Sequence, residues 1–402
     1  FALGLAYASA AREVEAYDDV ERALSYVLSA GDAPELDSTV LAKALVELVS
    51  LQVANGRTGD ARRSFETYSA ILATRQFDSE QARAVATLHR ARAAFAAGLA
   101  AAEVESLIHE ASGVPVPLDD PDCRVLLSTL LSLAQELNDA GQHPLAISAY
   151  RPIAEQEAPK GEATLALYHR IRLRVARMMR TERAYIQSAA MSEPTRAYYD
   201  AQKPLTDTLR RAARLECAFA RYNMALESKA PDDAMAGIAA LTGYVEACNA
   251  AHGRDDPITI EAEILRLVLR KFLIDSTKSR DALEQEWQSM HDRSVRVAGA
   301  DGSSTLTVLN SMALFYAHVG EPDTAIDYID RAIAANDPVH GPSPIYLDTK
   351  AEILAGIGDY KTAVALQQRV VEIAPEGVYP GIYKRLADYQ VALAGSRETA
   401  SP

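Results

Sequence analysis

A glycine-marked turn between two helical stretches recurs along this chain of 402 residues. Apolar residues on both sides of each turn follow the spacing i, i+3, i+4, i+7, which is the period of an amphipathic helix. The clearest turns fall at Gly56, Gly141, Gly320 and Gly358. No stretch shows the alternation typical of a β-strand. The chain therefore predicts repeated helical hairpins.

The two clearest copies lie near the C-terminus, where Gly320 and Gly358 are 38 residues apart. Small residues recur where two helices of a hairpin would cross. These are Ala313 and Ala351 in the first helices, and Ala325 and Ala363 in the second helices. A large side chain at such a crossing would force the helices apart, so we interpret these positions as packing positions rather than chemical ones.

These copies resemble the tetratricopeptide repeat (TPR) family, and the resemblance covers about two-thirds of the chain. An earlier copy matches at Leu130, Leu133, Ala134, Leu137, Gly141, Ala146 and Tyr150. A looser copy has Leu45, Leu48, Gly56, Ala61 and Phe65, and a weaker one begins at Tyr17 with Leu24. Gln52, Tyr68 and Lys350 depart from the family's pattern.

Two loops in the C-terminal half, 251–259 and 299–310, look like one loop used twice. Both are similar to the loop that opens the longer repeats of the kinesin-light-chain type. The histidine of that motif is absent from both loops, and its proline is kept only as Pro257. Since Asp or Ser followed by Thr before an apolar run also signals a helix N-cap, capping alone explains most of the motif.

The net charge of −14 argues against nucleic acid as the main partner. The three cysteines, Cys123, Cys217 and Cys248, have no metal-ligand spacing, so we expect free buried thiols. No apolar run is long enough to span a membrane. These features favour a cytoplasmic location and leave a periplasmic or secreted one open.

Residues 160–221 are basic in an otherwise acidic chain. They hold thirteen Lys or Arg and six Asp or Glu, a balance of +7 against −21 for the remainder. We expect two long helices here, 162–190 and 194–228, separated at Pro194. A stripe on the first helix is formed by Arg170, Arg174, Arg177 and Arg180. The stripe either pairs with acidic neighbouring repeats or docks an acidic protein, phosphate or membrane headgroups. RNA binding would need aromatic and basic residues on one face, which the sequence by itself does not establish.

No catalytic or metal-binding motif is present, so we predict no catalytic residue, no metal and no cofactor. The eight histidines are scattered, and none is four residues from another. His109 and His318 are interpreted as partly buried packing residues. The run from Asp119 to Asp122 is interpreted as a loop and helix cap rather than a calcium loop.

The predicted fold is all-α, a right-handed α-solenoid of stacked helical hairpins. We divide it into an N-terminal TPR-like array (1–159), a long basic helical pair (160–230) and a C-terminal TPR-like array (231–402). The last array would end in a capping helix, containing Tyr383, Leu386 and Tyr389, and a frayed tail from Gly395.

Such a solenoid predicts a non-catalytic scaffold that binds a partner peptide or domain in its concave groove. In the family it resembles, ligand-facing side chains come from the first helices. The corresponding residues here include Asn310, Leu314, Asp348, Glu352, Gln135 and Asn138. None is Lys or Arg, so we expect the C-terminal groove to prefer a neutral or basic segment.

The first alternative is a sensor or regulatory arm of a larger signalling protein, because the chain begins at Phe1 within what looks like a truncated repeat. A third possibility is a helical domain associated with an enzyme.

Overall fold

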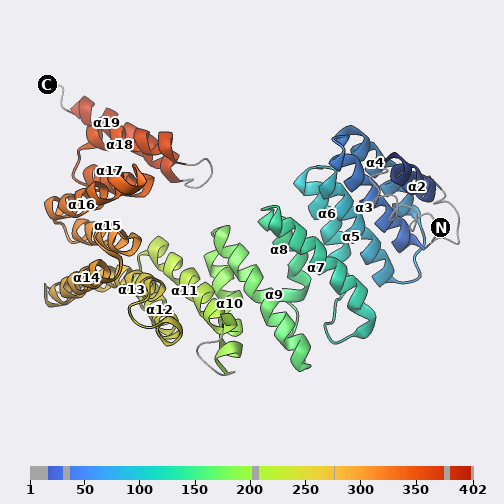
Figure 1. Cartoon of the computed structure of the whole chain (residues 1–402), viewed down its shortest axis with the longest axis horizontal. Coiled ribbons are helices and arrows are strands. Elements are labelled where there is room, and N and C mark those ends of the chain that lie inside the picture. Colours follow the sequence, from blue (N-terminus) through green and yellow to red (C-terminus); the bar gives the residue numbers. More distant parts are fainter. Residues whose placement is uncertain (1–16, 30–36, 202–207, 276, 375–380, 400–402) are drawn as a thin grey trace. The chain divides into compact units, whose positions relative to one another are not determined.

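The computed structural model describes residues 17–29, 37–201, 208–275, 277–374 and 381–399 (Figure 1). Every regular element in these ranges is a helix, as the sequence predicts. The chain divides into two compact units, Phe1–Thr195 and Arg196–Pro402, and the division falls inside helix α10.

The helices of the first unit are α2 (Tyr17–Ser29), α3 (Ser38–Ala54), α4 (Thr58–Thr74), α5 (Glu80–Ala96), α6 (Ala101–Ser112), the 3-10 turn η2 (Pro121–Cys123), α7 (Arg124–Asp139), α8 (His143–Ala154), α9 (Glu162–Thr181) and most of α10 (Tyr185–Ala201). The second unit has α11 (Thr208–Ser228), α12 (Pro231–His252), α13 (Pro257–Arg270), the 3-10 turn η3 (Lys271–Leu273), α14 (Thr277–Ala298), α15 (Ser303–His318), α16 (Pro322–His340), α17 (Pro344–Gly356), α18 (Tyr360–Ile373) and α19 (Gly381–Thr399).

Within each unit the helices stack as antiparallel hairpins in chain order (Figure 1). In the first unit the first helices α3, α5 and α7 pack in succession, and in the second unit α13, α15 and α17 do the same. A single hairpin cannot bury its apolar face, so each one is completed by its neighbours. The predicted all-α stack of hairpins is confirmed.

The turn glycines and crossing alanines lie where the sequence predicts them. Gly141 has φ +72° and Gly320 has φ +82°, a backbone region that residues with a Cβ rarely adopt. Ala313, Ala325 and Ala351 are fully buried at their helix crossings. Close helix approach thus rests on the absence of side-chain bulk at these positions.

Two of the departures from the repeat pattern find partners. The Lys350 ammonium donates to Asp330 Oδ1 of the preceding helix at 2.5 Å. Buried Gln52 donates its amide to Glu21 Oε1 of α2 at 2.9 Å. The Lys350 ammonium and the Gln52 amide nitrogen are therefore bonded within the repeat stack, whereas Gln52 Oε1 is buried without a hydrogen-bond partner among the described residues.

The predicted break at Pro194 is wrong. The chain turns earlier, at Arg183 with φ +61°, and Pro194 lies inside α10. Proline removes the bond to the carbonyl four residues back, here that of Ala190. Arg172 of α9 donates to that carbonyl through Nη2 at 3.4 Å and to the Met191 carbonyl through Nε at 3.4 Å. A tertiary contact thus lets the helix continue, and the basic segment contains three helices instead of two.

The C-terminal end also differs from expectation. Helix α19 continues to Thr399, so the tail predicted from Gly395 is helical as far as the structure describes it. Tyr383 is 56% exposed, whereas its neighbour Ile382 is 3% exposed and packs against Leu347 and Val370. Helix α19 thus covers the last hairpin through Ile382 and Tyr389, as a capping helix should, and not through Tyr383.

The two similar loops share one structural device. Thr259 Oγ1 donates to the Gly253 carbonyl at 2.9 Å, and Thr305 Oγ1 donates to the Gly299 carbonyl at 2.7 Å. Both glycines have positive φ, +89° and +82°. Asp256 caps α13 through the Ile258 amide, whereas the cap residue of α15 is Gly302 and makes no side-chain bond. The expectation of one loop used twice is confirmed.

Sequence reasoning missed a third copy of this turn, at Gly341. Its φ is +75°, and its carbonyl accepts the Asn336 amide at 2.6 Å. An asparagine from the preceding helix therefore replaces the threonine of the following one. The signal was the His-Gly pair, shared by 252–253 and 340–341 and followed in both cases by a proline at the next helix start.

Candidate functional site

Helix α9 presents an arginine whose contacts are all neutral. The Nη1 of Arg174 donates to Gln135 Oε1 of α7 at 2.6 Å and to the Tyr150 hydroxyl of α8 at 3.3 Å. The Arg174 residue is exposed. A guanidinium offers five N–H donors, so these contacts orient the group while leaving donors for a ligand.

This arginine lies in a cavity of about 230 Å³ between α7, α8 and α9. The cavity is lined by Gln135, Asn138, His143, Tyr150, Arg174, Arg177, Met178 and Thr181. The structure therefore brings together two sets of residues that the sequence suggested separately, the groove residues of α7 and the basic stripe of α9. We call this cavity the α7–α9 site.

The lining of the α7–α9 site contains two arginines and no carboxylate. Two carboxylates contact lining residues from outside: Asp139 Oδ1 accepts from Gln135 Nε2 at 2.6 Å and from Asn138 Nδ2 at 3.3 Å, and Glu182 Oε1 lies 3.1 Å from His143 Nδ1. The amide donors of Gln135 and Asn138 are thus taken by Asp139, whereas the Arg174 guanidinium and the Tyr150 hydroxyl line the same space, a combination suited to holding a carboxylate or another anionic group. The chemistry of these side chains favours binding.

The remaining arginines of α9 have different surroundings. Arg170 is exposed and does not line the cavity, and Arg180 also lies outside its lining. Arg172 donates from Nη1 to the Ala154 carbonyl at 2.9 Å and to the Tyr168 hydroxyl at 2.8 Å. Two members of the predicted stripe, Arg174 and Arg177, therefore line the cavity. Arg172, which does not belong to the stripe, bonds to groups of α8 and α9 and stabilises the fold.

The second half of the basic segment converges on one carboxylate. Asp200 accepts from Arg196 at 3.1 Å and from Arg214 at 2.9 Å, and its Oδ1 lies 3.5 Å from Nε of buried Arg210. The expected pairing with acidic neighbouring repeats holds only in part, because these three arginines share one carboxylate that belongs to the basic segment itself. Such a cluster ties α10 to α11, and its three arginines against one aspartate keep a positive excess.

The residues predicted for the C-terminal groove lie on α15 and α17, which pack against each other. Asn310 and Leu314 are partly exposed on α15, and Glu352 is exposed on α17. Asp348 is occupied: Arg385 of α19 donates to both of its oxygens, at 2.9 and 2.6 Å, and Gln367 donates at 2.9 Å. Asp348 therefore anchors α19, and a groove role stays a prediction for the other three residues.

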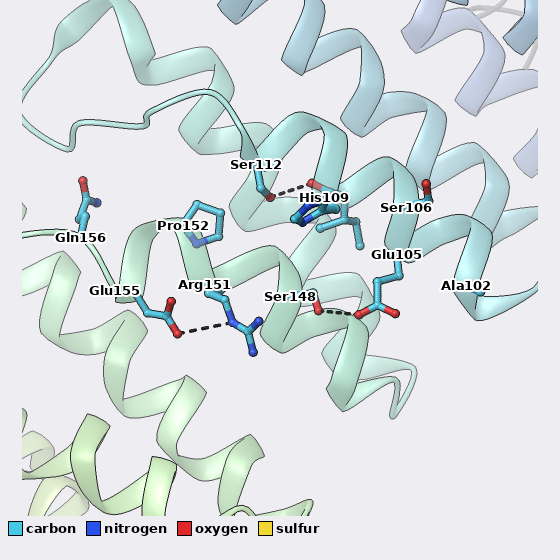
Figure 2. A pocket seen from close by; sticks show the side chains of 11 residues that line it. Ala102, Glu105, Ser106, His109, Ser112, Ser148, Arg151, Pro152, Glu155 and Gln156 are labelled. Carbon is cyan, nitrogen blue, oxygen red and sulfur yellow. Dashed lines mark hydrogen bonds and ion pairs between the residues drawn. The ribbon is translucent and has the colours of Figure 1, made fainter.

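A larger cavity, about 720 Å³, lies between the second helices α6 and α8 (Figure 2). Its polar side chains bond to one another: Ser148 donates to Glu105 at 3.2 Å, and Arg151 pairs with Glu155 at 3.4 Å. Buried Ile108 supplies apolar surface. Since its single arginine, Arg151, is paired with Glu155, this cavity offers no unpaired cation to an anionic ligand.

The prediction that His109 is a partly buried packing residue is wrong, because His109 is exposed and lines the α6–α8 cavity. His318 is also exposed, although its ring packs edge-on against Phe272. The buried histidines are His89 and His169, 5% and 6% exposed. Burial lowers the pKa of each to about 4, with smaller contributions from nearby cations.

The three cysteines are buried and none forms a disulfide, as expected. Asp120 caps the 3-10 turn η2 by accepting the Asp122 amide at 2.9 Å, which confirms the cap interpretation of that acidic run. Across the described ranges, no group of His, Cys, Asp and Glu is arranged to hold a metal ion. The helices in these ranges are too short or too polar to cross a bilayer.

The fold and the repeated turns define the chain as an α-helical repeat protein. No family model and no curated protein matches it. Solved structures similar to it include the TPR protein TTC0263 of Thermus thermophilus, 15% identical with a TM-score of 0.40, covering 56% of this chain and 99% of that one.

Two further structures are similar. BtubC (BKLC) from P. vanneervenii is 12% identical with a TM-score of 0.39, covering 61% of this chain and 88% of that one. The P58(IPK) TPR domain is 12% identical with a TM-score of 0.27, covering 98% of both chains.

Proposed function

We propose that this protein is a non-catalytic scaffold that binds an acidic segment of a partner protein at the α7–α9 site. The observation that carries the proposal is the exposed Arg174, which two neutral side chains orient toward a space lined by a second arginine. An ionised group of the partner would supply the negative charge that the lining lacks.

The charge of the proposed ligand is set by α9 and not by α7, the first helix of the repeat that contributes Gln135 and Asn138. Ser128, Leu131, Gln135 and Asn138 of α7 include no cation, so α7 alone indicates a neutral site. The cations come from the next first helix, α9, which lies on the other side of the same cavity. A preference of the C-terminal groove for a neutral or basic segment remains a separate proposal, resting on Glu352.

The test is fluorescence anisotropy with three labelled decapeptides, one rich in Glu, one in Ser and Gly, and one in Lys. We expect the acidic peptide to bind most tightly, and its affinity to fall as salt rises. Substituting both Arg174→Gln and Arg177→Gln should weaken it at least about tenfold, the loss expected when charge-assisted bonds are removed.

The matched control is Arg170→Gln, an exposed arginine of the same helix outside the cavity. It removes one positive charge from α9 without touching the site, so it should keep most of the affinity. Equal losses in the control and in the double variant, or equal binding of the basic peptide, would contradict the proposal. Displacement of the acidic peptide by single-stranded RNA at physiological salt would point to nucleic acid instead.

A further inference from the structure

A second cavity, of about 140 Å³, lies in the second unit between α13 and α14, and three arginines line it. Its lining consists of Arg254, Glu263, Arg266, Leu267, Glu286, Ser289, Met290 and Arg293. A single water needs roughly 10–15 Å³ of such space, so the cavity has room for a small polyatomic ion.

The innermost cation of this cavity is only partly satisfied. Arg293 is 5% exposed; its Nε donates to Asp255 at 3.0 Å and its Nη1 to Glu263 at 2.7 Å. Its Nη2 is buried and has no hydrogen-bond partner. A buried guanidinium nitrogen without an acceptor is costly, so an acceptor from outside the chain would stabilise it.

The other two arginines of the lining, Arg254 and Arg266, also have donors available for an anion. Nε of Arg266 is buried without an acceptor, and among the described residues Arg254 and Arg266 form no ion pair. Arg270 neutralises the carboxylate of Glu286 from outside the lining. The four arginines and the three carboxylates of Asp255, Glu263 and Glu286 therefore leave a local balance of +1, with two guanidiniums unpaired.

We propose that this cavity binds a tetrahedral oxyanion of the phosphate type. Guanidiniums from α13, α14 and the preceding loop approach the space from separate elements, which suits an anion with several acceptor oxygens better than a planar carboxylate. Arg254 belongs to the loop held by the Thr259–Gly253 bond, so the repeated loop has a binding role here in addition to its capping role. The site does not depend on the α7–α9 site.

The experiment is isothermal titration of the full chain with inorganic phosphate, with sodium acetate as a second titrant and ionic strength held constant with chloride. We expect saturable binding of phosphate at one site, and acetate at least about tenfold weaker. Substituting both Arg254→Gln and Arg266→Gln should weaken phosphate binding at least tenfold, whereas Arg296→Gln, an exposed arginine later on α14, should leave it unchanged.

Trp287, the only tryptophan, lies on α14 and is 1% exposed, so its emission reports whether each variant keeps the fold. If the double variant unfolds, Arg254→Gln alone is informative, because Arg254 is exposed and its loss leaves the core intact. Absence of saturable binding, or equal binding in wild type and the arginine variants, would overturn the proposal. Neither result would change the affinity for the acidic decapeptide, so this test is independent of the first.

Discussion

The two halves of the basic segment use the same residue type for opposite purposes. On α9, Arg174 contacts an amide and a hydroxyl, and no acidic side chain lines its cavity. Around α11, Arg210 and Arg214 share Asp200 with Arg196. A positive balance in the sequence thus covers one half in which Arg174 is held by neutral side chains and one half in which three arginines converge on a single aspartate.

The largest expected effect on the free energy of unfolding comes from removing Asp200, the carboxylate shared by Arg196, Arg210 and Arg214. Asp200→Ala would remove this carboxylate, while buried Arg210 keeps its bonds to backbone carbonyls, so we expect a loss of about 3 kcal/mol, the lower end for breaking a buried pair. Because Trp287 lies in the second unit, its fluorescence in urea should show the loss directly.

Glu227→Ala is the matched control for this prediction, since Glu227 is an exposed acid of α11. It should change the free energy of unfolding by no more than about 0.5 kcal/mol. Similar losses for both variants would show that Asp200 is an ordinary surface charge.

A second prediction separates the units by pH. His89 and His169 are both in the first unit, and burial lowers the pKa of each to about 4. Since the unfolded chain takes up these protons near pH 6.5, stability is complete above that pH and falls as the pH drops toward 4. Each histidine should cost the first unit roughly 2–3 kcal/mol by pH 4.

Far-UV circular dichroism should therefore begin to change at a higher pH than Trp287 fluorescence. Replacing His89 with leucine should move the dichroism transition to lower pH, because the neutral form is the one that packs. In the second unit, desolvation also lowers the pKa of His318, but this side chain is exposed, so its protonation should destabilise that unit less than protonation of His89 or His169 destabilises the first. A simultaneous change in both signals, unaffected by His89→Leu, would contradict the assignment.

A third prediction distinguishes two arginines within α9. Arg172 bonds to backbone carbonyls that Pro194 and the end of α8 leave open, so Arg172→Gln should cost about 1–3 kcal/mol in urea unfolding. It should not alter the affinity for the acidic decapeptide beyond that loss of fold. Unchanged stability would mean that α10 accommodates Pro194 without this contact.

The smallest expected effect on stability belongs to Arg174→Gln. The side chain is exposed and its partners are neutral, so the free energy of unfolding should change by less than about 1 kcal/mol. The same substitution should weaken acidic-peptide binding measurably. A large loss of stability would contradict this and would mean that Arg174 has a structural role, as Arg210 and Arg214 do.

The sequence alone determined the helical hairpins, because helix period, turn glycines and crossing alanines are local properties. It placed the turns at Gly141 and Gly320 and found the paired loops. It misplaced the helix break because a proline's effect depends on what bonds to the released carbonyl, and Arg172 comes from another helix. The burial of the histidines also depends on other helices. His109 was predicted to be partly buried and is exposed, whereas neighbouring helices bury His89 and His169, which the sequence did not single out.

For the site, the sequence provided the residue types and the tertiary structure decided how they are combined. Gln135 and Arg174 are 39 positions apart, and only the packing of α7, α8 and α9 brings them to 2.6 Å. In the same way, the contact with Arg385 converts Asp348 from a candidate ligand into an anchor. Local composition fixes which groups carry charge, but whether a charge meets a partner protein or its own chain depends on neighbours that are distant in sequence.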